Sequence, residues 1–323
     1  MKKWKILVND GMHAEGIERL RQEGFEVVEG PLSPEELRQR LDEFDVVVVR
    51  SATKLREELL LEVQRLKLIV RGGVGLDNID VAYAQSKGIE VRNTPAASSR
   101  SVAELVMGHM LSLARFIHLS NREMPQVGDV EFKALKKKYS KGIELAGKKL
   151  GIVGCGRIGK ALAALALGMG MEVIPVDVFD TLELDIYIAE RMIPLDIPVV
   201  SLDEMLPQAD FISIHVPAQS KPLIDRAAFE KMKRGVILIN AARGGVVDED
   251  ALLEALDAGI VRAAGLDVFE GEPHPKKALL QHPQVSVTPH IGASTIEAQK
   301  RIAHEVVDII LDAYQRSTEA QSS

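Results

Sequence analysis

The sequence contains a single cysteine, Cys155, among its 323 residues. One cysteine cannot form an internal disulfide, which suits a reducing compartment such as the cytoplasm. No apolar run approaches the roughly 18 residues that a membrane helix requires. The short apolar segment near the N-terminus stops at Asn9-Asp10, so we interpret it as a first strand and not as a signal peptide. These absences favour a cytoplasmic protein with no membrane partner.

An excess of positive charge is also absent. The 40 lysines and arginines are outnumbered by 47 aspartates and glutamates, and the net charge at pH 7 is −7. This balance argues against a general nucleic-acid-binding protein, although it does not exclude a local basic pocket. No cluster of histidine, cysteine and aspartate has the spacing of metal ligands, so we predict no metal site.

Short apolar runs alternate with amphipathic stretches along the whole chain. Two of the amphipathic stretches begin with capping boxes, at Ser33–Glu36 and at Ser201–Glu204. Continuously apolar strands separated by helices predict parallel sheets that are covered on both faces. The expected strands are Ile6–Val8, Val46–Val49, Leu68–Val70, Leu150–Val153, Val173–Val176, Phe211–Ile214, Val236–Ile239 and Val285–Val287.

The alternation occurs twice, and a chain of this length can hold two domains. Residues 1 to about 95 form a first α/β block, and a second block begins with the strand at Leu150. A long helical pattern, roughly Val102 to Leu119, and a last one, Ser294 to about Tyr314, are expected to join the two lobes. We expect the last helix to pack back on the first block.

A glycine motif, LGIVGCGRIGK, coincides with the expected strand at Leu150–Val153 and the start of a helix. Its glycines, Gly154, Gly156 and Gly159, have the G-x-G-x-x-G spacing. The first allows a tight turn, the second lets the backbone approach a pyrophosphate, and the third lets helix and strand pack closely. Asp177 ends the next strand, where an acid can bind the ribose hydroxyls of NAD and would repel the extra phosphate of NADP. A tight turn with no ligand is the alternative, and the order of strand, glycines, helix and acid favours NAD.

A second glycine-rich stretch, RGGVGLDNID at 71–80, also follows a strand. It lacks a matching third glycine, because position 78 is Asn78, so it is a poorer dinucleotide site. A loop rich in backbone N–H groups could still hold an anion. An anion site and a simple turn are equally compatible with these residues, and both interpretations stay open.

Three ionisable residues, Arg243, Glu272 and His290, follow segments that we expect to be strands. The carboxyl ends of parallel strands form the ligand crevice of an open α/β sheet, so these side chains could converge there. Removing a hydride from a secondary alcohol requires a base for the hydroxyl proton, and histidine suits that task. A neighbouring carboxylate would fix the orientation of the histidine, and a guanidinium would bind a substrate carboxylate with two hydrogen bonds.

Taken singly, each of these residues has a simpler explanation. His290 could be structural, Arg243 could be a solvated loop residue, and Glu272, next to Pro273, could belong to an ordinary acidic turn. Their shared position at strand ends favours the catalytic interpretation. His215 also lies at a strand end, but no acid partner is evident for it, so we expect it to pack near the cofactor.

These motifs together resemble the D-isomer-specific 2-hydroxyacid dehydrogenase family. The resemblance covers most of the chain, in the family's order, and rests on VVVVRSATKL, IVRGGVGLDNIDV, VRNTPAASSRSVAELVMGHML, GIVGCGRIG, GVILINAARGGVVDEDALLEAL, GLDVFEGEP and TPHIGAST. It implies two doubly wound parallel-sheet lobes. One is a flavodoxin-like substrate-binding domain of residues 1–95 plus 296–323, and the other is a Rossmann NAD-binding domain of residues 96–295.

The resemblance also implies roles for individual residues. The implied catalytic set is Arg243, Glu272 and His290. The implied cofactor contacts are Gly154, Gly156, Arg157, Ile158, Gly159, Asp177, His215, Val216, Pro217, Ala241, Ala242, Asp267, Gly292 and Ala293. The implied substrate contacts are Arg50, Ser51, Lys54, Gly73, Val74 and Gly75. Arg50 and Lys54 would hold a phosphate, and a solvated pair at a strand end is the alternative for them.

Within the family, RSATK and GGVGLDNID are most similar to the phosphoglycerate dehydrogenases of serine biosynthesis. This similarity implies NAD-dependent oxidation of D-3-phosphoglycerate to 3-phosphohydroxypyruvate by a homodimer or larger homo-oligomer. A glyoxylate or hydroxypyruvate reductase and a broad D-2-hydroxyacid dehydrogenase are the alternatives among enzymes. Outside enzymes, the alternative is an NAD-sensing corepressor-like binding protein. Glu272 argues against the formate dehydrogenases of the superfamily, which have glutamine instead.

Some features depart from the pattern of phosphoglycerate dehydrogenases. Many of these enzymes carry a C-terminal regulatory domain, whereas this chain ends soon after its last helical pattern, so we expect the short form. The segment before Lys148 is often aromatic in relatives; here residues 133–149 are rich in lysine, and the only tryptophan is Trp4. Cys155 is expected to be a small filler, and an oxidation-sensitive thiol at a helix N-terminus is the alternative.

Overall fold

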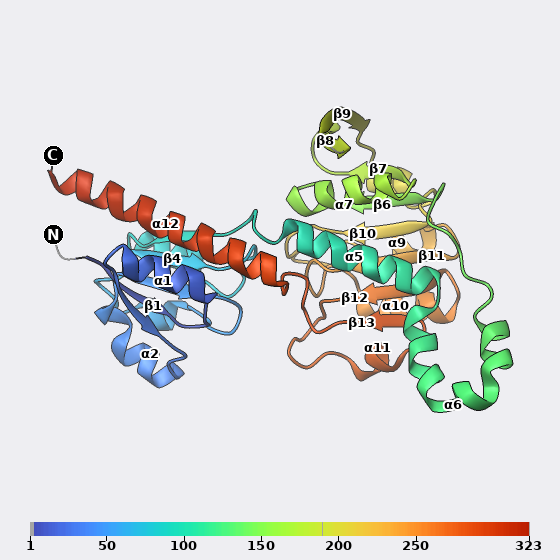
Figure 1. Ribbon diagram of the computed structural model, residues 1–323, viewed down its shortest axis with the longest axis horizontal. Coiled ribbons are helices and arrows are strands. Elements are labelled where there is room, and N and C mark those ends of the chain that lie inside the picture. The colour runs from blue at the N-terminus through green and yellow to red at the C-terminus, as the bar shows by residue number, and fades with distance from the viewer. Residues whose placement is uncertain (1–2, 189, 323) are drawn as a thin grey trace. The chain divides into compact units, whose positions relative to one another are not determined.

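The computed structural model describes residues 3–188 and 190–322 and divides into two compact units (Figure 1). Unit 1 consists of Met1–Ser98 and Ala293–Ser323, and unit 2 of Ser99–Gly292. Each unit contains a parallel sheet with helices, so the expected class of two α/β lobes is confirmed. The assignment of one lobe to substrate and the other to cofactor stays a prediction.

The sheet of unit 1 has the strand order β2-β1-β3-β4-β5, and all of its neighbouring strands are parallel. This is the flavodoxin-like order. The strands are β1 Lys5–Val8, β2 Glu26–Glu29, β3 Val46–Val49, β4 Leu68–Arg71 and β5 Glu90–Asn93. The central strand β3 reads VVVV and is buried throughout, as expected for a strand covered on both faces.

The helices of unit 1 are α1 Ala14–Gln22, α2 Pro34–Arg40, α3 Glu57–Leu60, α4 Val81–Ser86 and α12 Ile296–Ser322, with a 3-10 turn, η1, at Leu41–Glu43. The last helix packs on the first block, as expected, because α12 contacts α1 and β4. Gly16 of α1 allows this approach, since a Cβ there would lie 2.8 Å from Cβ of Ala303. The ring of Tyr314 on α12 meets Trp4 and Phe25 edge to face, with centroids 5.2 Å apart in both pairs.

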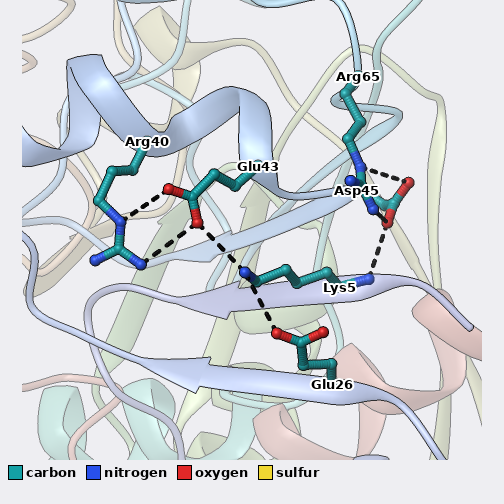
Figure 2. Close-up of polar contacts among 6 residues, drawn as sticks. All are labelled: Lys5, Glu26, Arg40, Glu43, Asp45 and Arg65. Atoms are coloured by element: carbon teal, nitrogen blue, oxygen red, sulfur yellow. Dashed lines mark hydrogen bonds and ion pairs between the residues drawn. The ribbon is translucent and has the colours of Figure 1, made fainter.

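A charged cluster lies at the amino-terminal ends of the unit 1 strands (Figure 2). Asp45, immediately before β3, accepts hydrogen bonds from the backbone N of Lys5 and from the guanidinium of Arg65. Burial alone would raise the pKa of Asp45, but the bonds from Arg65 and Lys5 outweigh it and lower the pKa. This cluster stabilises the edge opposite to the one at which the expected substrate residues lie.

The main sheet of unit 2 has the order β13-β12-β11-β10-β6-β7, again all parallel. Its strands are β6 Lys149–Val153, β7 Glu172–Val176, β10 Phe211–Ile214, β11 Val236–Asn240, β12 Val261–Leu266 and β13 Val285–Val287. The order reverses between β6 and β10, so the ligand crevice of a Rossmann sheet belongs at their carboxyl ends. An antiparallel hairpin, β8 Thr181–Ile188 with β9 Arg191–Pro198, follows β7 where a further parallel strand is usual.

The helices of unit 2 are α5 Ser99–Ala114, α6 Ile117–Lys138, α7 Arg157–Gly168, α8 Leu202–Met205, α9 Arg226–Lys231, α10 Glu249–Asp257 and α11 Lys277–Gln281. The expected helix from Val102 to Leu119 is wrong in its extent. It ends at Ala114 because Phe116 adopts a left-handed conformation with φ of 57°, and α6 starts anew. In the described part of the chain no single helix is long and apolar enough to cross a membrane, although α5 and α6 pass that test together as a pair bent by 61°.

The strands β2 and β5 and the hairpin β8–β9 were not predicted, whereas β12 is the strand expected before Glu272. The edge strands β2, EVVE, and β5, EVRN, have too few apolar residues to stand out from loops. In β8 only alternate residues are buried, such as Leu182 and Leu184, which pack on the core beside α7. Both capping boxes are confirmed, with the Ser33 and Ser201 hydroxyls accepting from the backbone three residues on.

Candidate active site

The glycine loop joins β6 to α7, and its three glycines meet three different constraints. Gly154 has a φ of 92°, and a Cβ there would lie 2.8 Å from the backbone of His215. Gly159 packs helix on strand, because its Cβ would lie 2.3 Å from the carbonyl oxygen of Gly154. Around Gly156 there is nothing within 4 Å of an added Cβ. The middle glycine therefore faces open space, as a backbone that approaches a pyrophosphate must.

Asp177 and Cys155 meet behind this loop. The backbone N of Cys155 donates to Asp177 Oδ2 over 2.5 Å, so the acid at the end of β7 is held against the glycine loop. The thiol of Cys155 is 1% exposed, and burial, together with the charge of Asp177, raises its pKa to about 12. The filler interpretation of Cys155 is therefore supported over the reactive one, because a thiol with this pKa is not ionised near neutral pH.

Other expected cofactor residues lie near the same edge of the unit 2 sheet. Arg157 and Ile158 are the first residues of α7, while His215, Val216 and Pro217 follow β10, and Ala241 and Ala242 follow β11. His215 Nε2 lies 2.9 Å from Ser213 Oγ, and burial lowers the pKa of His215 to about 4. A ring that is neutral at pH 7 and tied to its own strand suits packing, as expected for His215.

Arg243 lies on the loop after β11, and this loop touches the loop that leads to Glu272. A Cβ at Gly244 would lie 2.0 Å from the carbonyl oxygen of Phe269, so only glycine allows the approach. Asn240 shapes the turn, because its Nδ2 donates to the Arg243 carbonyl and its Oδ1 accepts from Ala242 N. The half-buried Arg243 also donates from its guanidinium to the Ala242 carbonyl over 2.6 Å.

Glu272 and His290, 18 residues apart in the chain, form a hydrogen-bonded pair. Glu272 Oε2 lies 2.9 Å from His290 Nδ1, and Glu272 Oε1 accepts from the backbone N of Phe269 over 2.9 Å. The carboxylate is thus oriented by its own loop and orients the imidazole in turn. Because Nδ1 is used in this way, the proton acceptor available to a substrate is Nε2. The side chain of His290 is 47% exposed, so a small molecule can reach it.

Asp267 and Gly292 are in direct contact within unit 2. The Asp267 carboxylate is 1% exposed and accepts from the backbone N of Gly292 over 2.9 Å. The carbonyl of Ala293, the first residue of the second segment of unit 1, accepts from Gln299 Nε2 over 2.7 Å. The contacts of Asp267, Gly292 and Ala293 with a cofactor stay predictions. The Asp267 carboxylate is already hydrogen-bonded to a backbone N–H group.

In unit 1, Arg50 follows β3 at the carboxyl edge of the sheet. Its backbone N donates to Asp10 Oδ2, and its guanidinium donates to Gln299 Oε1 over 2.5 Å. Burial lowers the pKa of Arg50, against the opposing effect of the Asp10 charge. Asn78 supports the turn after Arg50 by donating to the carbonyls of Arg50 and Thr53. A small pocket of unit 1 includes Arg50, Gly72 and Gln299 in its lining.

A second arginine, Arg71, lies next to Arg50 at the same edge of the sheet, and it was not among the substrate residues expected from the sequence. Arg71 ends β4 and pairs in register with Val49, the residue before Arg50. Its guanidinium lies over Gly73, where a Cβ would come within 1.9 Å of Nη1. The signal is present in LIVRGG, since a charge that ends an apolar strand resembles Arg50, but the anion site expected at 71–80 was attributed to backbone N–H groups and not to the Arg71 side chain.

The other residues expected to contact substrate follow Arg50 or Arg71 in the chain. Ser51 and Lys54 are exposed, whereas Gly73 is buried and Val74 and Gly75 are half-buried. Thr94 N donates to the Gly73 carbonyl over 3.0 Å, so the loop that follows β4 is held at the end of β5. In the described residues no group of three or more histidine, cysteine, aspartate or glutamate side chains could hold a metal ion.

Comparison with known proteins places this geometry in a family. The model of the D-isomer specific 2-hydroxyacid dehydrogenase NAD-binding domain matches residues 107–292. A hydroxypyruvate reductase of Thermotoga maritima is 44% identical over 316 residues, which cover 96% of this chain and 98% of that protein. The chain belongs to the D-isomer-specific 2-hydroxyacid dehydrogenase family. It is an NAD-dependent D-2-hydroxyacid dehydrogenase, an oxidoreductase that acts on small molecules.

Phosphoglycerate dehydrogenases are also among the relatives of this 2-hydroxyacid dehydrogenase. A D-3-phosphoglycerate dehydrogenase of Methanocaldococcus jannaschii is 45% identical over 299 residues. These residues are 92% of this chain but only 55% of that protein. Among solved structures, the TT0316 protein from Thermus thermophilus has a TM-score of 0.82 at 34% identity. The match covers 95% of this chain and 96% of that protein.

NAD fits the residues of the unit 2 site. The open space over Gly156 is adjacent to the N-terminus of α7, a helix of 12 residues whose first N–H groups can bind phosphate. Asp177 at the end of β7 stands where a ribose is bound in such sheets. Gly154, Gly156 and Gly159 thus show the three separate roles that the motif requires.

Proposed function

We propose that this dehydrogenase oxidises D-3-phosphoglycerate to 3-phosphohydroxypyruvate, a step of serine biosynthesis. The observation that carries the proposal is the arginine pair, Arg50 and Arg71, at the carboxyl ends of the neighbouring parallel strands β3 and β4. Two guanidinium groups beside Gly72 and Gly73 match the charge and the oxygen atoms of a phosphate ester. Gly72 N donates to the Val49 carbonyl over 2.8 Å, which keeps the two strand ends in register.

His290 serves as the base in the proposed reaction. Its Nε2 accepts the proton of the substrate hydroxyl, and NAD, when bound, accepts the hydride from the α-carbon. Glu272 stabilises the positive charge that then develops on the imidazole, because its Oε2 lies 2.9 Å from Nδ1. The same bond keeps Nδ1 protonated, so that Nε2 enters the reaction as an acceptor.

Arg243 binds the substrate carboxylate in this proposal. Its guanidinium is positioned by a bond to the Ala242 carbonyl, and its loop is pinned to the Glu272 loop at Gly244. A guanidinium that binds both carboxylate oxygens orients the α-carbon. Part of the binding energy then serves to align the substrate with the reacting groups. Gly73, Val74 and Gly75 contribute backbone N–H groups to the substrate, with Ser51 and Lys54 at the rim.

Hydroxypyruvate reductase is the second candidate. It is favoured by the relative from Thermotoga maritima, since that protein and this chain cover each other almost completely. The two activities differ in the phosphate: a phosphoglycerate dehydrogenase needs cations for it, whereas a hydroxypyruvate reductase has no phosphate to bind. The effects of substituting Arg50 and Arg71 on each substrate therefore distinguish the two candidates.

A substrate panel with two arginine variants tests the proposal. Rates are measured with NAD for 3-phosphoglycerate and in the reverse direction for 3-phosphohydroxypyruvate, hydroxypyruvate and glyoxylate. Arg50→Ala and Arg71→Ala are expected to raise KM for phosphorylated substrates on the order of a hundredfold, since each removes a charged hydrogen bond to phosphate. KM for hydroxypyruvate should change little.

Lys87→Ala, on an exposed position of unit 1, is the control for a general loss of positive charge. An equal effect of the arginine variants on phosphorylated and unphosphorylated acids would remove the phosphate proposal. A wild-type preference for hydroxypyruvate over its phosphorylated form would select the reductase.

A further inference from the structure

A buried histidine outside the candidate catalytic set, His109 on α5, uses both of its ring nitrogens. It is 4% exposed, and its Nδ1 and Nε2 lie 3.1 Å from Ser286 Oγ and from Thr288 Oγ1. Gly265 of β12 makes room for it, because a Cβ there would lie 2.9 Å from Cβ of His109. A leucine or methionine would fill this space without the two hydrogen bonds, so packing alone does not account for a histidine.

The donor and the acceptor of each hydrogen bond around His109 can be assigned, because the series of bonds ends at a carboxylate. Thr288 Oγ1 donates to Asp267 Oδ1 over 2.6 Å, and an ionised carboxylate can only accept. The single hydroxyl proton of Thr288 is then used, so its oxygen accepts from His109, and Nε2 carries the ring proton. Nδ1 is left to accept from the Ser286 hydroxyl. Burial lowers the pKa of His109, although the charge of Asp267 opposes this, and a neutral ring is what this order of donors requires.

At the end of this chain of bonds, Asp267 holds the turn that follows β13. Its Oδ1 also accepts from the backbone N of Ile291 over 2.8 Å, and its Oδ2 accepts from Gly292 N over 2.9 Å. These two peptides directly follow His290, whose φ of 54° lies in the left-handed region. Such a conformation costs a non-glycine residue roughly 1–2 kcal/mol, so its surroundings must hold it in place.

We propose that His109 is a positioning residue for His290 and acts through Thr288 and Asp267. This inference rests on the proposed role of His290 as the base. His109 fixes the Thr288 hydroxyl, the hydroxyl fixes the Asp267 carboxylate, and the carboxylate holds the two amides that keep the strained turn. His290 N donates to the Thr288 carbonyl over 3.1 Å, so the same threonine also supports the turn from the other side.

Substitutions at Thr288 test the chain of bonds with little change in shape. Thr288→Val removes the hydroxyl and keeps the volume, whereas Thr288→Ser keeps the hydroxyl. The valine variant is expected to lower kcat on the order of tenfold to a hundredfold, because a small displacement of a catalytic group has such an effect. The serine variant should retain most of kcat.

Substitutions at His109 test the first step of this series of hydrogen bonds. His109→Gln can place an amide N–H near the position of Nε2, while His109→Leu fills the space without a donor. The leucine variant is expected to lose kcat as Thr288→Val does, and the glutamine variant to recover much of it. The double variant with leucine and valine should lose no more than either single one, since both break the same chain.

Hydrogen exchange of the Ile291 and Gly292 amides separates this inference from the proposed function, because it requires no turnover. In the protein without substrate, exchange should be faster in His109→Leu and Thr288→Val than in wild type, and slow again in the Gln and Ser variants. Wild-type exchange and wild-type kcat in the folded valine variant would overturn the inference. If His290→Ala keeps full turnover, His290 is not the base and the proposal for His109 fails as a statement about catalysis. Exchange in the valine variant would then show whether the bonds still hold the turn.

Discussion

At the scale of single residues, burial decides which ionisable groups are chemically active. His290 and Glu272 are paired yet accessible, and they are the groups assigned to proton transfer. Cys155, despite its place in the glycine loop, has a pKa raised to about 12 by burial and the charge of Asp177. Burial alone lowers the pKa of His215 to about 4, so its ring is neutral at pH 7. The two groups proposed for proton transfer thus combine a hydrogen-bonded partner with access to solvent.

Glu249 gives a prediction at this scale, because it is a buried carboxyl with one oxygen lacking a hydrogen bond. It is 4% exposed; Oε1 accepts from Glu270 N over 2.6 Å, and Oε2 has no partner among the described residues. Burial, the largest cause, raises the pKa of Glu249 in the folded protein. Its contribution to stability is therefore fully present below the unfolded pKa and is lost as pH rises through the folded pKa.

Glu249→Gln keeps an acceptor for Glu270 N and removes the buried charge. It is expected to raise the free energy of unfolding at pH 7 by about 1 kcal/mol, the low end of the cost of a buried unpaired group. The gain should vanish near pH 3, below the ordinary pKa of the unfolded carboxyl, where wild-type Glu249 is protonated in both states. Urea unfolding at the two pH values measures this. Glu249→Ala, which loses the bond to Glu270, should be less stable than wild type at both, and a glutamine variant less stable than wild type at pH 7 would contradict the argument.

At the scale of elements, the candidate residues lie on loops at the carboxyl ends of parallel strands. Arg243 follows β11, Glu272 lies on the loop after β12, and His290 follows β13, and these strands are neighbours in the sheet. Their loops are locked by backbone contacts, above all at Gly244. The geometry of the candidate site therefore depends on loop-to-loop packing as much as on the strands.

Gly244→Ala is predicted to damage catalysis more than its neighbour, Gly245→Ala. At Gly244 the added methyl group would lie 2.0 Å from the carbonyl oxygen of Phe269, so the Arg243 and Glu272 loops must separate. At Gly245 the methyl group meets nothing within 4 Å, and only the left-handed backbone, φ of 78°, is strained. Both changes should cost roughly 1–3 kcal/mol of stability.

Steady-state rates and thermal unfolding of the two variants measure this difference. The kcat of Gly244→Ala should fall on the order of a hundredfold, because the groups on the two loops lose their alignment. Gly245→Ala should keep most of its kcat at a similar loss of stability. Equal rates in the two variants would show that the contact at Gly244 does not align the site.

At the scale of the whole molecule, each unit has its own hydrophobic cores. The clusters around Phe211 and Phe229 lie within unit 2, and those around Trp4 and Phe44 lie within unit 1. No core cluster of the described residues draws on both units. Each unit therefore buries the continuously apolar strands of its sheet within its own core.

The molecule is also predicted to be a homodimer or a larger homo-oligomer. Helix α6 exposes large apolar side chains, with Val130 83% and Phe132 58% accessible, and such groups on a surface indicate an interaction site. Light scattering during gel filtration should give at least twice the 35.4 kDa of one chain. A mass of one chain at micromolar concentration would contradict the prediction.

The sequence by itself determined the class of fold, the glycine motif and the family. These follow from patterns local in the chain: apolar runs such as VVVV, the spacing of Gly154, Gly156 and Gly159, and capping boxes. Local patterns specify backbone conformation and burial, so they can be read before the chain is folded. The pairing of Glu272 with His290 was expected because both follow strands of one sheet.

Only the tertiary structure decided which distant residues meet. His109 and Ser286 are separated by 177 positions and yet share a hydrogen bond, and Arg71 joins Arg50 because two strands pair in one register. The left-handed backbone of His290 has no signature in the sequence, since only a few per cent of non-glycine residues adopt that conformation and no local pattern marks which ones. Such features depend on packing between elements, and the side chains that support the candidate base could be found only there.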